Sequence, residues 1–301
     1  MLAALGYTAA NICLRAVSHC DPVWVSAVKS VPTVVLAAPL LLLRARRGQG
    51  VWPHRRALVS LILAALAGQL IGNVVFQWSL GIVGLALAVP VCLVAQIAGS
   101  AVLGRIFLQE SITPRMAIGV VMLVAASTIF SFSAEDAYRS VTQALWTDAM
   151  PRWKLALSVG AVCLSGLSYA WLGLVIRRGT TPDVPIASTL FIVCIAGMIS
   201  LGILSPMRIG WAGIRQTAIE DLGMMILAGL CNFAAFYSLT KALQLTSLLY
   251  VNALGASQAM LAAIAGVALF QEAASRSLEI GIALSVVGIL LMSRTRRKPS
   301  T

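Results

Sequence analysis

Polar side chains that could bind a solute interrupt several of the longest apolar stretches of this sequence. Gln96 and Gln258 each stand inside one such stretch, and Lys29 stands inside another. A glutamine amide both donates and accepts hydrogen bonds, so it suits a zwitterion, an amide or a sugar hydroxyl. A lysine among apolar residues can hold a carboxylate or a phosphate. These three residues are therefore candidates for contact with a substrate.

Other polar and aromatic residues extend this candidate set. Asn73, Asn232 and Asn252 add amides with the same hydrogen-bonding capacity. Trp78 and Tyr237 stand near the ends of apolar stretches, where they could form a wall of the same site. Aromatic residues at such places are more often anchors at a membrane interface, and we give that interpretation more weight.

Structural roles compete with binding for the glutamines and the lysine. A buried glutamine can join two helices through a hydrogen bond worth about 0.6–2 kcal/mol. A lysine near a helix end can extend its amine to the membrane interface. Lys29 lies about seven residues after Pro22, where we expect a helix to begin, so both interpretations of this lysine remain open.

Glu110 and Glu272 are tempting proton carriers, but their positions favour a structural role. Each follows a glutamine and ends an apolar stretch, in "IFLQE" and "ALFQE". A carboxylate at such a boundary can accept hydrogen bonds from the unpaired amides at the start of the next helix. Because His19 and His54 both lie between apolar stretches, we see no obvious proton relay. We therefore favour facilitated diffusion or exchange over proton antiport.

The two glutamates also reveal an internal repeat, because their separation, 272 − 110 = 162 positions, relates other residues as well. The matching pairs are Tyr7 and Tyr169, Arg15 and Arg177, Asp21 and Asp183, Gln96 and Gln258, and Gly104 and Gly266. Between the early and late pairs the register slips by three residues, so that Asn73 and Trp78 correspond to Asn232 and Tyr237. The chain is therefore a duplication of one unit.

The repeat helps to assign roles to the candidate residues. Gln96 and Gln258 are equivalent, which favours a shared central cavity slightly over separate structural hydrogen bonds. Lys29 corresponds to Phe191, so the duplicated architecture does not require a charge there. That asymmetry favours a specific role for the lysine, such as holding a substrate anion.

Composition indicates a membrane protein. Hydrophobic residues make up 59% of the 301 positions and charged residues 11%, against about 25% charged in soluble proteins. The net charge of +12 comes from basic residues that mostly lie in short links between apolar stretches, where they orient a protein in a bilayer rather than bind nucleic acid. The six cysteines form no CxxC motif and predict neither a disulfide framework nor a metal site.

Ten stretches are long and apolar enough, or nearly so, to cross a bilayer as helices. They are residues 2–16, 22–43, 57–79, 82–107, 114–132, 155–176, 185–204, 221–240, 244–270 and 277–293. Basic clusters at 44–47, 55–56, 177–178 and 294–298 place both termini in the cytoplasm, because cytoplasmic loops retain Lys and Arg. Five spans per unit is an odd number, so the second unit is inverted, a recurrent plan among carriers.

The two units resemble the EamA domains of the drug/metabolite transporter superfamily. Each has a fourth helix rich in small residues that ends in "GRIFLQE" or "GVALFQE", followed by a fifth helix with "AIGVV" or "EIGIAL". The resemblance implies a ten-helix carrier of small metabolites, often amino acids or related compounds. It divides the chain into a first repeat (1–133), an extracytoplasmic linker (134–153), a second repeat (154–295) and a basic cytoplasmic tail (296–301).

We therefore expect an all-α integral membrane protein of the cytoplasmic membrane that acts as a secondary transporter. Its expected partners are a small-molecule substrate and the lipid bilayer, without nucleic acid, and with a homodimer left open. No cofactor or metal is expected. The alternatives are a membrane-embedded enzyme acting on lipid or isoprenoid, for which we see no catalytic group, and a channel-like pore.

Overall fold

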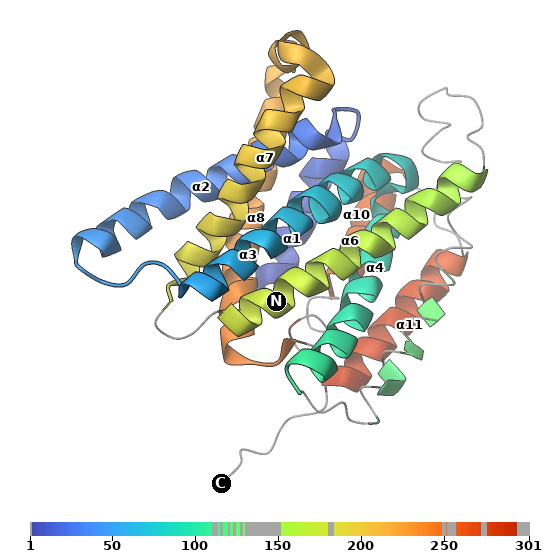
Figure 1. The fold of residues 1–301 in the computed structure, drawn as a ribbon. Coiled ribbons are helices and arrows are strands. Elements are labelled where there is room, and N and C mark those ends of the chain that lie inside the picture. Colours follow the sequence, from blue (N-terminus) through green and yellow to red (C-terminus); the bar gives the residue numbers. More distant parts are fainter. Residues whose placement is uncertain are drawn as a thin grey trace.

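The computed structural model describes residues 2–109, 152–179, 184–248, 251, 257–271 and 276–293, with single positions between 114 and 129. All regular secondary structure in these ranges is helical (Figure 1). The elements are α1 (Leu2–Ala16), α2 (Pro22–Arg46), α3 (Arg55–Ala67), the π-helix η1 (Gly68–Asn73), α4 (Val74–Phe107), α6 (Arg152–Gly179), α7 (Ile186–Arg215), α8 (Ile219–Leu245), α10 (Ser257–Phe270) and α11 (Arg276–Ser293).

Five continuous helical stretches of the described chain are long and apolar enough to cross a membrane. One of them, Arg55–Phe107, combines α3, η1 and α4 over 53 residues. At 1.5 Å per residue it would be about 80 Å long if straight, far more than a bilayer core of about 30 Å. The chain instead turns back at Gly84, whose φ of 76° is open to glycine but costly for other residues. Two predicted spans thus occupy one helical stretch.

Several predicted boundaries were wrong. We placed the turn between the third and fourth spans at residues 80–81, whereas it lies at Gly84, because the apolar run gives no signal of the turn. We ended the eighth span at residue 240 and began the ninth at 244, but α8 continues to Leu245. Helix α10 (Ser257–Phe270) forms the end of the predicted ninth span. The linker up to residue 151, most of the span 114–132 and the basic tail lie outside the described residues.

Helix pairing in the structure follows the repeat. Helix α1 of the first repeat packs against α8 of the second, and its equivalent α6 packs against α3 and η1. Helix α2 packs against its own equivalent α7, and α4 packs against α10. Each repeat therefore completes the packing of the other, and the described helices form one bundle (Figure 1).

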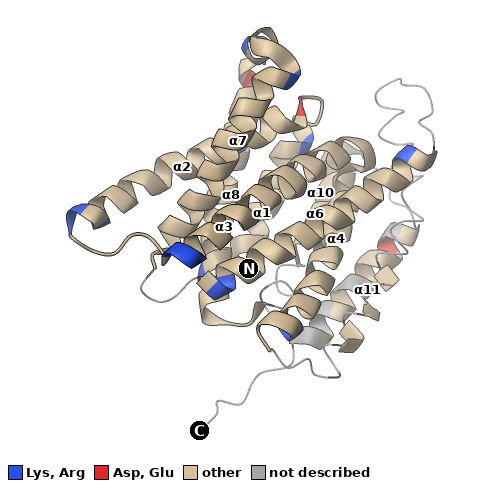
Figure 2. Ribbon diagram, viewed as in Figure 1, with Lys and Arg blue, Asp and Glu red and all other residues tan. Residues whose placement is uncertain are grey.

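Charged residues are rare in the middle of this bundle. Figure 2 shows most Lys, Arg, Asp and Glu residues at helix ends and in connecting loops, with long uncharged stretches between them. Helix α2 shows how such an end is built, because the Asp21 carboxylate accepts hydrogen bonds from the backbone amides of Val23 (2.9 Å) and Trp24 (3.2 Å). Pro22 occupies the first turn, where its missing N–H is not needed.

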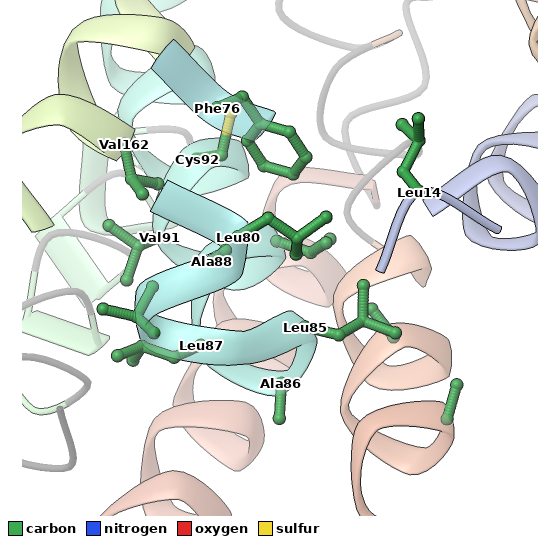
Figure 3. Close-up of a cluster of buried hydrophobic side chains, with 14 of the residues drawn as sticks. Leu14, Phe76, Leu80, Leu85, Ala86, Leu87, Ala88, Val91, Cys92 and Val162 are labelled. Carbon is green, nitrogen blue, oxygen red and sulfur yellow. The ribbon is translucent and has the colours of Figure 1, made fainter. Parts of the chain in front are cut away.

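A cluster of apolar side chains, which we call the inter-repeat core, fills one end of the space between the two repeats (Figure 3). It includes Leu14 of α1, Phe76 and Leu80 of α4, Met225 of α8 and Ala262 of α10. Leu80 and Met225 are fully buried. The repeats are thus in close apolar contact there.

Close approach of α6 to α4 depends on Gly166. A Cβ atom at this position would lie 2.3 Å from the backbone oxygen of Cys92 and 2.8 Å from the Ala95 Cβ. We expect Gly166→Ala to destabilise the protein by about 1–3 kcal/mol, since a backbone oxygen cannot move aside without shifting the helix. The measurement is thermal unfolding of the purified protein in detergent.

Gly160→Ala is the matched control, because nothing lies within 4 Å of a Cβ built at that position of the same helix. It should leave the melting temperature unchanged or slightly raised. Equal melting temperatures for the two variants would contradict the tight contact between α6 and α4.

Candidate functional site

A cavity of about 550 Å³ lies between the two repeats. Most of its wall is apolar, with side chains from α1, α4, α6, α8 and α10. Its polar lining comes from both repeats and comprises Tyr7, Asn11, Lys29, Gln69, Asn73, Gln96, Tyr169, Asn232, Ser238, Thr246 and Gln258. A concave, mostly apolar space with a few convergent polar groups is the usual form of a small-molecule site.

Among the described residues, the cavity lining reaches the surface where α1 begins. Its lining residues on α1 run from Leu2 to Leu14, and those on α8 run from Asn232 to Thr246 at the end of that helix. Leu2 is 75% exposed, so the cavity meets the outside where α1 begins. Toward the other end, Leu14 and Phe76 belong both to the cavity wall and to the inter-repeat core, which closes the path.

A chain of hydrogen bonds, which we call the amide relay, organises one wall of the cavity. The Lys29 amine donates to Asn73 Oδ1 at 2.7 Å, and the Tyr169 hydroxyl donates to the same oxygen at 2.9 Å. The Asn73 amide nitrogen then donates to Gln69 Oε1 at 2.6 Å, and Gln69 Nε2 donates to the backbone oxygen of Val193 at 3.1 Å. Four helical elements of both repeats are thereby joined.

The π-helix η1 positions the two amides of this relay. Gln69 and Asn73 both lie in η1, which contains one residue more per turn than an α-helix and so changes which side chains share a face. Gln69 is 3% exposed and reaches across to α7. Short π-helical turns occur often at functional sites, and this one points both amides toward the second repeat.

Two glycines leave the space that the relay occupies. A Cβ on Gly197 would lie 2.5 Å from Gln69 Cδ, and one on Gly72 would lie 2.6 Å from the Tyr169 ring. Both distances are far below van der Waals contact, so larger residues there would displace a relay side chain. The amide relay therefore requires these two glycines beside it as well as its own polar side chains.

Lys29 is a buried cation that faces this cavity. Only 7% of the residue is exposed, and its amine is held by Asn73, so the interpretation in which it extends to the membrane interface was wrong. No carboxylate of the described residues lies within ion-pair distance of Lys29; the described ion pairs are His19–Asp221 and Arg208–Asp21. A buried charge with amide and hydroxyl neighbours is costly unless an anion completes its surroundings.

Both predicted glutamines line the cavity. Gln258 of α10 is 7% exposed and Gln96 of α4 is half-buried. The side-chain amides of Gln258, Asn232 and Asn11 make no hydrogen bond to any other described residue, although all three border the cavity. Amides that border a cavity without a hydrogen-bond partner among the described residues are suited to hydrogen-bond a solute.

The remaining predicted residues have different surroundings. Trp78 packs on the inter-repeat core, and Tyr237 is 46% exposed with its ring 6.5 Å from that of Phe233; neither lines the cavity. Asn252, Glu110 and Glu272 lie outside the described residues.

Sequence reasoning missed the two tyrosines of the cavity wall. Tyr7 and Tyr169 are equivalent under the 162-residue offset, which was a usable signal, but neither was proposed for the site. Asn11 was missed as well, because an amide in an apolar helix has the same local sequence whether it faces a cavity or a neighbouring helix.

Comparison with known proteins decides the family. A model of the EamA-like transporter family matches residues 1–132 and again residues 156–294. The chain belongs to the EamA-like transporter family. The two matches confirm the repeat found from the offset, and together with the apolar helices they make this EamA-like protein a multi-pass membrane protein of the drug/metabolite transporter superfamily.

A solved structure described as "Crystal structure of protein" shares the fold of this EamA-like protein. Its TM-score is 0.68 at 15% sequence identity, over 97% of this chain and 94% of that chain. At this identity the likeness concerns the fold alone. No curated protein matches the sequence.

The buried cation generates a prediction about stability. We expect Lys29→Met to raise the unfolding free energy by about 0.5–2 kcal/mol, because it removes a buried charge without a carboxylate partner among the described residues, while Asn73 keeps the Tyr169 hydroxyl as a donor. Thermal unfolding in detergent without ligands measures it. Lys241→Met on the exposed side of α8 is the control and should have no effect. A lower melting temperature for Lys29→Met would mean that the lysine holds the fold together.

Proposed function

We propose that this EamA-like protein is a secondary transporter that moves a small metabolite bearing a carboxylate, such as an amino acid or a related compound, across the cytoplasmic membrane. The observation that carries the proposal is the buried Lys29 amine, which has no carboxylate partner among the described residues, in a cavity shared by both repeats. Membership of a transporter family supports the activity, and the lysine supports the charge of the cargo.

The binding mode follows from the chemistry of the wall. A carboxylate within reach of Lys29 would form a charge-assisted hydrogen bond, which is stronger than a neutral one. The amides of Asn232, Gln96 and Gln258 would donate to or accept from the polar remainder of the substrate. Apolar neighbours such as Phe76 and Phe236 would contact its hydrocarbon part. The site therefore suits a compact molecule with a polar and an apolar side.

Transport by alternating access is supported by the arrangement of the repeats. In this proposal the chain has ten spans in two inverted units, with both termini in the cytoplasm, and the cavity is open where α1 begins, the cytoplasmic side. The opposite end is closed by the inter-repeat core and by polar contacts between the repeats. Inverted units can exchange the roles of the two ends, which is how such carriers expose one site to each side in turn.

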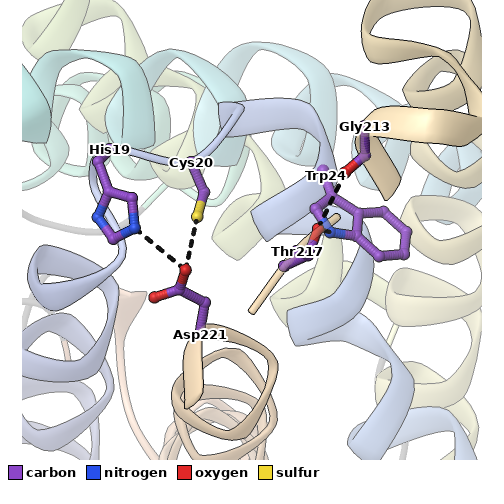
Figure 4. A network of polar contacts seen from close by, with 6 residues as sticks. All are labelled: His19, Cys20, Trp24, Gly213, Thr217 and Asp221. Carbon is purple, nitrogen blue, oxygen red and sulfur yellow. Dashed lines mark hydrogen bonds and ion pairs between the residues drawn. The ribbon is translucent and has the colours of Figure 1, made fainter. Parts of the chain in front are cut away.

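The contacts that close the far end, which we call the latch, join residues 19–24 of the first repeat to residues 208–221 of the second. Arg208 Nε donates to Asp21 Oδ2 at 3.1 Å, and the Trp24 indole donates to the Thr217 hydroxyl at 3.1 Å (Figure 4 shows the latter pair). Both contacts must break before the cavity can open toward this end.

Coupling to a proton gradient is not part of the proposal. No Asp or Glu is among the described residues that line the cavity. We therefore propose facilitated diffusion or exchange. Transport into proteoliposomes should have the same rate with and without an imposed pH gradient, and uphill accumulation driven by that gradient would contradict the proposal.

The function is tested by ligand screening followed by transport. Purified protein would be screened by thermal shift against amino acids, other carboxylates, nucleobases, sugars and amines, since a ligand that binds only the folded state raises its stability. A ligand found in this way should show saturable uptake and counterflow in proteoliposomes. Uptake that never saturates would identify a pore, and chemical conversion of the ligand would identify an enzyme.

Substitutions in the cavity should separate binding from folding. We expect Lys29→Met to abolish the thermal shift given by a carboxylate ligand, and Gln96→Leu and Gln258→Leu to abolish it or reduce it at least about tenfold in affinity, since each lost polar partner costs about 1–3 kcal/mol. Tyr237→Phe, outside the cavity, is the control. Unchanged shifts in both glutamine variants would assign these residues to helix packing.

The latch predicts a shift between states. Arg208→Gln removes the contact with Asp21 while Asp21 still caps α2, so the closed end should open more often. Met225→Cys, introduced into a variant without native cysteines, reports this opening because Met225 is fully buried at that end. We expect several-fold faster labelling by a thiol reagent in the Arg208→Gln background, and no change with Arg215→Gln. Equal labelling in all backgrounds would show that the contact does not hold the end closed.

A further inference from the structure

Three side chains with metal-binding atoms meet at the latch end of the bundle (Figure 4). His19 and Cys20 lie in the loop between α1 and α2 of the first repeat, and Asp221 lies in the first turn of α8 of the second. One imidazole nitrogen, one sulfur and one carboxylate oxygen lie within 4.8 Å of one another. Residues 202 positions apart in the sequence thus converge at one point.

Two of the three donor separations are close to those of a tetrahedral zinc site. With Zn–N and Zn–O bonds of about 2.0 Å and a Zn–S bond of about 2.3 Å, a tetrahedron separates N from O by about 3.3 Å and S from O by about 3.5 Å. The observed separations are 3.1 Å from His19 Nε2 to Asp221 Oδ2 and 3.6 Å from Cys20 Sγ to the same oxygen. These two separations need to change by only a few tenths of an ångström for the donors to surround an ion, and the third, between the His19 nitrogen and the Cys20 sulfur, is at most 4.8 Å.

The solvent exposure of these residues also allows a metal ion to reach them. The His19 side chain is 61% exposed and that of Asp221 is 23% exposed, so an ion can enter from the aqueous side and keep a water as its fourth ligand. Nitrogen, sulfur and oxygen donors together favour zinc and similar transition metals over magnesium or calcium, which prefer oxygen alone.

A reactive thiol is the competing interpretation of Cys20. Burial, followed by the charge of the Asp221 carboxylate and a hydrogen bond to it, raises the pKa of this thiol to about 11. At neutral pH the thiol is therefore protonated and a poor nucleophile. Binding of a metal ion would displace that proton to solvent and leave a thiolate ligand.

We propose that His19, Cys20 and Asp221 bind Zn²⁺ and that the bound ion holds the latch end closed. Two ligands belong to the first repeat and one to the second, so the ion bridges the two bodies that must separate for this end to open. It acts beside the Asp21–Arg208 and Trp24–Thr217 contacts and reinforces them. Zinc would therefore inhibit transport from a position outside the cavity. The binding of metal is independent of the proposed function, whereas the inhibition rests on it.

Cobalt spectroscopy tests the site without any transport assay. Reduced, purified protein titrated with Co²⁺ should bind one ion per chain with the absorption band of a cobalt–thiolate bond, and Zn²⁺ should displace the cobalt and raise the melting temperature. Cys20→Ser should abolish the band, and His19→Ala and Asp221→Asn should weaken binding at least about tenfold, which even the loss of an outer-sphere partner can cost. Absence of the band in the wild-type protein, or its persistence in Cys20→Ser, would overturn the site.

Matched controls separate this site from other donors in the chain. Cys231→Ser on α8 and His54→Ala before α3 change a thiol and an imidazole far from the cluster in sequence, and both should bind Co²⁺ as the wild type does. Loss of the band in Cys231→Ser would place the site elsewhere and overturn the assignment. Melting temperatures without metal show that each variant is folded.

Inhibition is measured once a transported ligand is known. Zn²⁺ should slow uptake by the wild-type protein several-fold. It should slow thiol labelling of Met225→Cys to the same degree in a variant that retains Cys20. Uptake by Cys20→Ser should be insensitive to zinc. If Co²⁺ binds but Zn²⁺ does not change the rate of transport, the proposal that the bound ion holds the latch end closed would be wrong. Absence of any transported ligand would count against the proposed function and leave the metal result standing.

Discussion

The structure depends on how a lysine is kept inside an apolar bundle. Lys29 is buried among the helices, and the described part of the chain offers it no carboxylate. The amine is instead hydrogen-bonded to an uncharged oxygen, the side-chain carbonyl of Asn73. Hydrogen bonds with Tyr169 and Gln69 hold the Asn73 side chain in place. The π-helical turn, the glycines that clear space and the contact with α7 all serve to fix that oxygen in place.

Such a solution leaves the cation incompletely compensated, and this has a functional meaning. A lysine paired with a carboxylate would be more stable, but the pair would have no net charge with which to attract a solute anion. Amide oxygens reduce the cost of burial without cancelling the positive charge, so attraction remains for an anion that enters the cavity. The two repeats divide this task unequally. The position equivalent to Lys29 is Phe191 and that equivalent to Gln69 is Ala228, so the second repeat supplies packing where the first supplies charge.

The sequence predicted the architecture far better than the wall of the site. The offset of 162 residues and the apolar stretches were visible because duplication and membrane insertion act on long segments. Gln96, Gln258, Asn73 and Asn232 were found because amides are rare inside such segments, and all four line the cavity. Trp78, which was proposed for the site but does not line the cavity, and Tyr7, which lines it but was not proposed, show what the sequence could not predict. Whether an aromatic ring faces a cavity, a core or lipid depends on helix rotation, and a single π-helical turn alters that rotation without a signal in the sequence.

The contact between Gly197 and Gln69 has a consequence for how proteins of this kind diverge. The two positions belong to different repeats and lie 128 residues apart, as 197 − 69 = 128, yet the Gln69 side chain fills the space that a Cβ on residue 197 would need. A mutation that enlarges residue 197 displaces the Gln69 side chain from the amide relay unless residue 69 has already been shortened, whereas shortening residue 69 first leaves a void and no clash. Evolution across this contact is therefore directional: the polar residue must be lost first, and a lineage that later fills position 197 cannot regain the glutamine in one step.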